Sequence, residues 1–382
     1  MAPSHSQFVA ARTPLSSLTG PALLAMLAAL LAGCASDAPP LRPLPNPAEV
    51  RARIVERMPA SVPDRAGWAT DIQAALAALK IDPNESNLCA VLAVTAQESG
   101  FVVDPKVPGM ARIAWAEIDR RAEGLGLPAT LLHLALKLDS PNGKTYADRI
   151  DAAKTERDLS DVFDDFISAV PLGQRLFGGY NPVRTAGPMQ VQIDFARQHL
   201  ARKPYPYVVE GSLRDEVFSR RGGLYFGIAH LLDYPAPYDQ PIHRFADYNA
   251  GQYASRNAAF QQAVSSVTGI PLVADGDLVR FDGDRNRPGA TEVAVRSIAD
   301  RLGMDDRAIR DALESGSGPD FGAGRLAQRV YALADAIKGR PLPRASIPTI
   351  KLKSPKIQRK LTTDWFATRV QSRWERCMAV PG

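Results

Sequence analysis

Apolar side chains recur along most of this 382-residue chain every three or four positions, which is the spacing of amphipathic α-helices. In residues 64–79, for example, Trp68, Ile72, Leu76 and Leu79 repeat at this spacing. The helices predicted from the pattern span residues 47–58, 64–79, 82–100, 111–125, 127–138, 146–167, 193–202, 213–232, 242–248, 291–302, 305–314, 324–338 and 363–378. Alternating strand patterns are few, so the predicted fold class is mainly α.

The most apolar of these segments, residues 82–100, has a marked beginning and end. Asp82 is the expected N-cap, and Glu85, three residues later, is the expected second member of a capping box. Gly100 is expected to end the helix in the left-handed conformation. Residues 88–96 carry no charge, and a helix that is apolar on every side is normally buried. We therefore predict that this helix lies at the centre of its domain.

Glu98 is the first ionisable residue after the apolar run, and it lies close to the C-terminus of the predicted helix. A helix carries partial negative charge at that end, and apolar surroundings also disfavour an ionised carboxylate. Both effects are expected to raise the pKa of Glu98. A glutamic acid that stays protonated near neutral pH is suited to general acid catalysis. The alternative is a surface glutamate that reaches solvent at the helix end.

The N-terminus has the features of a secretion signal. An apolar run at residues 21–31, too short to span a membrane as a mature helix, ends in the sequence LAGC. This resembles the lipobox of bacterial lipoproteins, which implies that residues 1–33 are a signal peptide and that Cys34 is lipidated. Ala35 follows Cys34, where an aspartate would favour retention in the inner membrane. We therefore expect a lipid-anchored, periplasm-facing protein, at the outer membrane rather than the inner, with residues 34–60 as lipidated cysteine and tether. The alternative is a plain secretory signal.

The charge, the cysteines and the motifs of the sequence limit the classes of partner and cofactor that we predict. The net charge is +5 at pH 7, and basic residues mostly alternate with acidic ones, so no nucleic-acid partner is predicted. With Cys34 assigned to lipid, Cys89 and Cys377 either form a disulfide between the central helix and the C-terminal segment or remain two buried thiols. No zinc, nucleotide or serine-hydrolase motif occurs in the sequence, so neither a metal nor a cofactor is predicted.

Three short segments carry the chemistry: residues 97–101 (QESGF), 187–191 (GPMQV) and 246–251 (ADYNAG). In this order they resemble the signature of lytic transglycosylases with the lysozyme-like fold. In that family the glutamate acts first as general acid and then as base, a role that falls on Glu98. The resemblance implies a supporting role for the other positions: Ser99 orients Glu98, Met189 and Gln190 line the cleft and contact the N-acetyl group, and Tyr248 and Asn249 close over the bond that is cleaved.

The implied reaction cleaves the MurNAc–GlcNAc β-1,4 bond of peptidoglycan, and the 6-hydroxyl of the muramic sugar attacks to leave a 1,6-anhydro end. It requires no second carboxylate, unlike most glycoside hydrolysis. If water attacks instead, as in a muramidase, Asp104 and Asp247 are the nearest candidates for a second carboxylate. A third reading is a non-catalytic lipoprotein that binds peptidoglycan as a scaffold.

The predicted domain order is a lysozyme-like domain at 61–270, with an insertion at about 102–184, and a helical C-terminal extension at 271–382. The insertion is inferred because Glu98 and Gly187 lie much closer together in the family than they do here. Pro188 also departs from the small or apolar residue that is usual in the family. The insertion is expected to form a small helical subdomain beside or over the cleft. As a whole, the chain is also similar to a family of proteobacterial lipoproteins of unknown function.

Overall fold

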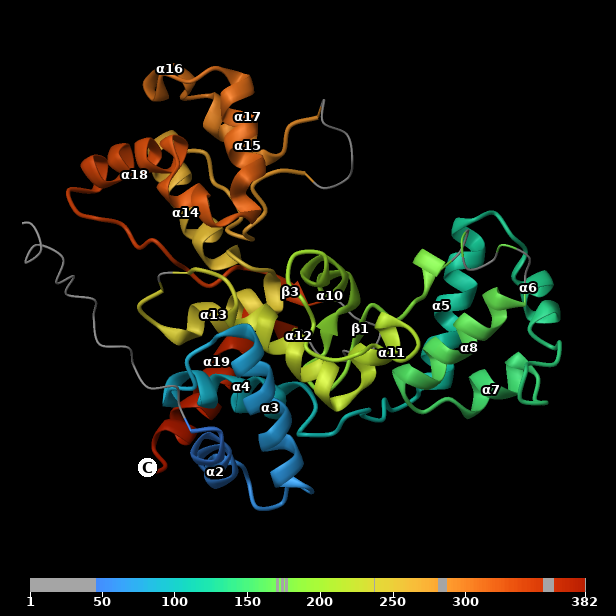
Figure 1. Cartoon of the computed structure of the whole chain (residues 1–382). Coiled ribbons are helices and arrows are strands. Elements are labelled where there is room, and N and C mark those ends of the chain that lie inside the picture. The colour runs from blue at the N-terminus through green and yellow to red at the C-terminus, as the bar shows by residue number, and fades with distance from the viewer. Residues whose placement is uncertain are drawn as a thin grey trace, which may run out of the picture. The chain divides into compact units, whose positions relative to one another are not determined.

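The computed structural model describes residues 46–381, except 170, 171, 173, 174, 176, 177, 237, 281–286 and 353–360. The predicted signal peptide, Cys34 and the first part of the tether lie outside the described residues. The described chain is mainly helical, as predicted, with two short antiparallel hairpins (Figure 1). None of its helices, within the described residues, has the length and hydropathy needed to cross a membrane.

One large apolar core surrounds α4 (Glu85–Glu98), whose residues from Leu88 to Thr95 are all buried. The predicted central, buried helix is therefore present. Its N-cap is Asn84 rather than Asp82, because the Asn84 side chain accepts the N–H of Asn87 at 2.9 Å. The other helices around this core are α2 (Pro47–Arg57), α3 (Arg65–Leu79), α10 (Ile193–Leu200), α11 (Leu213–Phe218), α12 (Arg220–Leu232), α13 (Pro241–Ala250) and α19 (Thr363–Met378).

The predicted insertion contains α5 (Met110–Gly124), α6 (Ala129–Ala135), α7 (Tyr146–Ala152), α8 (Glu156–Ser168) and the 3-10 turn η2 (Gly178–Tyr180). Its apolar side chains, including Met110, Tyr146 and Ile150, join the core that surrounds α4. One helix had been predicted over residues 146–167. The structure has two, because Thr155 caps α8 and forms a capping box with Asp158, which starts a new helix there.

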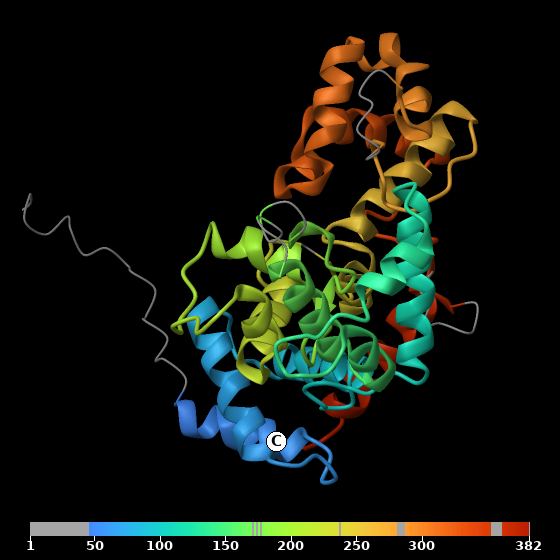
Figure 2. The ribbon, with the colours of Figure 1, turned by 90° about the vertical axis from the view of Figure 1, so that its right-hand side faces the viewer.

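A second apolar core is built from residues between 260 and 334 (Figure 2). Its elements are α14 (Ala254–Thr268), α15 (Ala290–Arg296), α16 (Ala299–Leu302), α17 (Asp306–Glu314), α18 (Arg325–Lys338) and the 3-10 turns η3 (Ser315–Ser317) and η4 (Pro319–Ala323). No helix had been predicted where α14 lies. Its buried face includes the polar residues Ser255, Asn257 and Gln261, so the apolar pattern that reveals other helices is weak there.

Two features of the structure bear on the predicted domain order. The tether was placed at 34–60, but α2 is folded into the first core through Val50 and Ile54, which are almost fully buried. The C-terminal extension was placed at 271–382 as one unit. Instead, the chain runs from the second core back to the first, where α19 packs against α4 and α13 (Figure 1). Its apolar face, with Phe366 and Val370, completes the core around α4.

Two hairpins complete the fold. Strands β1 (Thr185–Ala186) and β2 (Val191–Gln192) pair antiparallel, with Thr185 opposite Gln192. Strands β3 (Lys351–Leu352) and β4 (Leu361–Thr362) pair in the same way directly before α19. The first hairpin carries the GPMQ segment at its turn and so presents one of the three motifs.

Candidate functional site

Glu98 is the last residue of α4, and the chain leaves the helix immediately after it. Ser99 is the C-cap, and both its N–H and its hydroxyl donate to the carbonyl oxygen of Thr95, at 3.1 and 3.2 Å. Gly100 follows with φ +60°, as predicted for the end of this helix. The Ser99 hydroxyl therefore stabilises the helix end, and the implied role of Ser99 in orienting the Glu98 carboxyl stays a prediction.

The turn between β1 and β2 needs glycine at its first position. Gly187 has φ +74°, and a Cβ atom there would lie 2.3 Å from the carbonyl oxygen of Val217. Gln190 ends the turn with φ +50°, and its side-chain amide donates back to the Gly187 carbonyl oxygen at 3.2 Å. Thr185 donates to the Gln190 side-chain oxygen at 3.2 Å. Gln190 is thus half-buried and held by its own hairpin.

Helix α12 makes room for this turn with two glycines one helical turn apart. A Cβ atom on Gly223 would lie 2.5 Å from Pro188, and one on Gly227 would lie 2.6 Å from the Met189 sulfur. Only glycine lets the turn approach the helix this closely. The Met189 side chain is fully buried there. The whole residue is 0% exposed, so the structure leaves no accessible atom of Met189 for the implied contact with an N-acetyl group.

Tyr248 on α13 connects the other two motifs. Its hydroxyl donates to the Met189 carbonyl oxygen at 2.6 Å, which ties α13 to the hairpin turn. Burial raises the pKa of Tyr248 well above its usual value, and the charge of Glu98 raises it further. The Tyr248–Met189 hydrogen bond thus joins two of the three motifs, and both residues belong to the apolar core that also contains residues 88–94 of the helix that ends at Glu98.

His230 on α12 packs against Tyr248, with ring centroids 5.0 Å apart, and its Nε2 lies 3.2 Å from the Tyr248 carbonyl oxygen. Burial lowers the pKa of His230 to about 4. The imidazole is therefore neutral at physiological pH, and it holds Tyr248 in place through the ring contact and the hydrogen bond to the Tyr248 carbonyl oxygen. His230 belongs to none of the three motifs, so this neighbour of Tyr248 was not predicted.

Asn249 and Asp247 have structural contacts of their own. The side-chain oxygen of Asn249 accepts the hydroxyl hydrogen of Thr363, the first residue of α19, at 2.9 Å. Thr363 was not predicted, because it lies 114 residues away in sequence. Asp247 is fully buried, and its carboxylate accepts the hydroxyls of Tyr234 and Tyr238.

The same Asp247 carboxylate accepts the backbone N–H groups of Tyr253 and Ser255, at 3.0 and 2.6 Å. Burial raises the pKa of Asp247, although these hydrogen bonds act in the opposite direction. With its oxygens engaged inside the protein, Asp247 is no longer a candidate for a second carboxylate. Asp104 is half-buried; burial raises its pKa, and a hydrogen bond with Thr155 opposes that shift.

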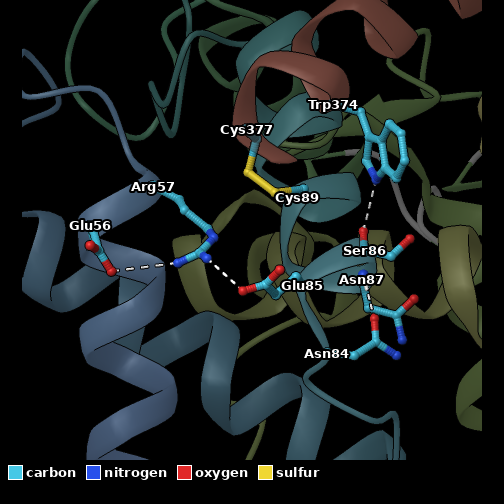
Figure 3. Close-up of a disulfide and its surroundings, with 9 residues drawn as sticks. All are labelled: Glu56, Arg57, Asn84, Glu85, Ser86, Asn87, Cys89, Trp374 and Cys377. Carbon is cyan, nitrogen blue, oxygen red and sulfur yellow. Dashed lines mark hydrogen bonds and ion pairs between the residues drawn. A yellow bond between two sulfur atoms is a disulfide. The ribbon is translucent and has the colours of Figure 1, made fainter. Parts of the chain in front are cut away.

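A disulfide joins the central helix to the C-terminal helix (Figure 3). Cys89 of α4 and Cys377 of α19 are bonded, with Cα atoms 5.5 Å apart. Of the two alternatives left open by the sequence, the structure contains the pairing. Nearby, the indole N–H of Trp374 donates to the Ser86 carbonyl oxygen at 3.1 Å. The two helices are therefore held together covalently and by a hydrogen bond between two partly buried residues.

The start of α4 is also tied to α2 by a charged pair. Arg57 is 6% exposed, and its Nη2 lies 2.7 Å from an oxygen of Glu85 (Figure 3). Glu56 lies further away, at 3.5 Å from Nη1. A buried guanidinium without a counter-charge is strongly unfavourable, so Glu85 fixes the packing of α2 against α4. It therefore acts as an ion-pair partner between two helices rather than in the predicted capping box.

Comparison with known proteins now identifies the family. The family described as "Protein of unknown function (DUF1615)" matches residues 61–380. This chain belongs to the DUF1615 family. It is similar to the "Uncharacterized protein YaiW" of Escherichia coli (strain K12), with 54% identity over 366 residues that cover 96% of this chain and 98% of the relative. No solved structure matches the chain.

Within the described residues of this DUF1615 chain, no group of three or more His, Cys, Asp or Glu side chains is arranged to hold a metal ion. The ionisable groups described at the candidate site are Glu98, Tyr248 and His230. A signal for the site's packing was present in the sequence: Gly223 and Gly227 interrupt an otherwise apolar helix one turn apart, which is typical of a close approach by another segment.

Proposed function

We propose that this protein is a lytic transglycosylase that cleaves the MurNAc–GlcNAc β-1,4 bond of peptidoglycan with Glu98 as its single acid and base. The observation that carries the proposal is the position of Tyr248. It donates to the Met189 carbonyl oxygen at 2.6 Å, and its pKa responds to the charge of Glu98. These contacts support the proposal because residues of two motifs bond to each other in the core that also contains the helix ending at Glu98.

In the proposed reaction, the Glu98 carboxyl protonates the oxygen of the glycosidic bond as the bond breaks. The carboxylate then accepts the proton of the sugar's 6-hydroxyl, which bonds to the anomeric carbon. Glu98 ends the cycle protonated, no water is consumed, and the product is a 1,6-anhydro sugar. Tyr248 and Gln190 would form the wall against which the sugar is held.

The test compares Glu98→Gln with Glu123→Gln, an exposed glutamate on α5. Both proteins are incubated with purified sacculi, and soluble muropeptides are measured by mass spectrometry. We expect the unmodified protein and the Glu123→Gln control to release products with anhydro ends. Glu98→Gln should lower the rate by roughly 10²–10⁴-fold or more with an unchanged melting temperature. Products heavier by one water would identify a muramidase. No release by the unmodified protein would refute both enzymatic proposals.

Two contacts favour a second candidate, a lipoprotein that binds peptidoglycan without cleaving it. The Tyr248 hydroxyl and the Asn249 side chain both bond inside the protein, and the Met189 side chain is buried. A site retained only for binding would cosediment with sacculi and leave them intact. In that outcome, Glu98→Gln would change neither product release nor the bound fraction.

We further propose that lipid on Cys34 anchors the protein at the periplasmic side of the outer membrane. The proposal is supported by the LAGC sequence and by Ala35 after the cysteine. Labelling with an alkyne fatty acid should modify the protein, and Cys34→Ala should abolish the label. Membrane fractionation should then place the unmodified protein with the outer membrane, and recovery with the inner membrane would contradict that location.

A further inference from the structure

A cavity whose lining lies far from Glu98 in the sequence has the features of a small-molecule site. It has a volume of about 570 Å³ and lies between the start of α14 on one side and η4 and α18 on the other. Pockets that bind small molecules measure roughly 300–1,000 Å³ and combine apolar walls with a few polar groups. Three tyrosines and two arginines dominate this wall: Tyr238, Tyr253, Arg256, Tyr331 and Arg344.

Tyr253 is held in the cavity wall in a conformation that a tyrosine rarely adopts. Its φ is +68°, in the left-handed region, and its backbone N–H donates to the buried Asp247 carboxylate at 3.0 Å. Such backbone strain persists only where surrounding structure imposes it, and it is often associated with binding sites. Here the surrounding structure is the Asp247 network, which fixes the entry to α14.

The hydroxyl of Tyr253 is available to a ligand. The residue is 4% exposed, and its hydroxyl, which is not fully buried, makes no hydrogen bond with any residue that the structure describes. The Tyr331 hydroxyl in the same wall is fully buried and also has no partner among the described residues, which is rare inside proteins and calls for an explanation. Because both tyrosines line the cavity, a molecule bound there is a partner that their hydroxyls can reach.

Arg256 gives the cavity a positive charge. Its guanidinium lies over the ring of Tyr253, 4.3 Å from the centroid, and near the ring of Phe321 at 5.2 Å. It donates to the main-chain oxygens of Gly316 and Gly318, at 2.6 and 2.9 Å. Among the described residues, no carboxylate lies within ion-pair distance of it. These contacts fix its position at the wall without an ion-pair partner among the described residues.

Arg344 supplies free donors on the opposite wall. It pairs with Asp335 at 2.7 Å and lies over the ring of Tyr331, 3.9 Å from the centroid. Its Nε–H donates to none of the described residues. The ionised side chains that line the cavity are thus two arginines and one aspartate. Asp247 lies behind Tyr253, does not line the cavity, and already accepts hydrogen bonds from four groups.

We propose that this cavity binds a small organic carboxylate with a flat apolar body. The carboxylate accepts hydrogen bonds from the Tyr253 hydroxyl and the free Arg344 N–H groups, and it faces the charge of Arg256. The apolar body packs against the rings of Tyr238 and Tyr331. The proposal is independent of glycan cleavage, because none of these residues belongs to the three motifs around Glu98.

The experiment measures binding of 2-naphthoate and of its neutral isostere 2-naphthamide to the full chain by isothermal titration calorimetry. Ala332 is an exposed alanine of α18 that lines the cavity, and Ala336 is an exposed alanine of the same helix that does not. Ala332→Trp fills the cavity without disturbing a buried position, and Ala336→Trp is its matched control. Tyr253→Phe removes only the unpartnered hydroxyl.

We expect saturable one-to-one binding of 2-naphthoate and at least roughly tenfold weaker binding of 2-naphthamide, because the amide lacks the charge that the arginines recognise. Ala332→Trp should abolish binding, and Ala336→Trp should leave it unchanged. Tyr253→Phe should weaken 2-naphthoate binding roughly tenfold without changing the melting temperature. Absence of saturable binding at millimolar 2-naphthoate, equal affinity for both molecules, or equal effects of the two tryptophans would overturn the proposal.

Discussion

The packing of the hairpin turn against α12 can be tested with one added methyl group. In Gly187→Ala, the new Cβ would meet the carbonyl oxygen of Val217 at 2.3 Å and the Cα of Gly223 at 2.9 Å. Both are backbone atoms, which cannot move aside as a flexible side chain can. The left-handed φ of +74° adds a second cost. Strain of about 1–2 kcal/mol and overpacking of about 1–3 kcal/mol predict a loss of about 2–5 kcal/mol in the free energy of unfolding.

Gly143→Ala is the matched control. Gly143 has a nearly equal φ of +77°, but nothing lies within 4 Å of its Cβ position. It should therefore lose only the strain, about 1–2 kcal/mol. Urea unfolding followed by far-UV circular dichroism measures both variants, and the difference between them isolates the contact with Val217. Equal losses in the two variants would refute the close approach of the turn to α12.

Three further predictions concern the supports of the site. The two cysteines of the disulfide are 288 residues apart, so reducing it should lower the free energy of unfolding by about 5 kcal/mol. Urea unfolding with and without a reductant measures this loss. An unchanged urea midpoint would contradict the prediction. Because the pKa of His230 is depressed to about 4, the unfolded chain binds a proton below pH 6.5 that the folded chain does not. Stability should fall by up to about 3 kcal/mol as the pH drops from 6.5 to 4, and His230→Gln should flatten that profile in pH-dependent unfolding. Glu85→Gln should lower the melting temperature more than Glu56→Gln, because Glu85 is the nearer partner of the buried Arg57, and equal shifts would contradict this.

The sequence predicted the structure correctly where the apolar spacing and the capping residues of a single helix define it. The buried run before Glu98, the stop at Gly100 and the segment 363–378 all follow local rules of burial and capping, and the structure has them at the predicted positions. Local rules also account for two errors. Thr155 and Ser219 each cap a new helix inside a longer apolar pattern, and the apolar periodicity continues across the break.

The contacts that complete the site could not be predicted in this way. Asn249 meets Thr363, and Tyr248 meets the main chain of Met189, across separations of 114 and 59 residues. Which carbonyl a tyrosine reaches depends on how helices pack, and sequence spacing does not encode it. The strained Tyr253 was missed for the same reason, since its conformation is imposed by hydrogen bonds to a buried aspartate.

The return of α19 to the first core affects how the protein is made. One side of α4 is covered by residues 363–378, which leave the ribosome last. Until then, an apolar surface that includes Cys89 has no permanent cover, so the nascent chain is exposed to chaperones and proteases for almost its whole synthesis. A premature stop before residue 363 would therefore produce an unstable polypeptide rather than a shortened protein with an intact first core.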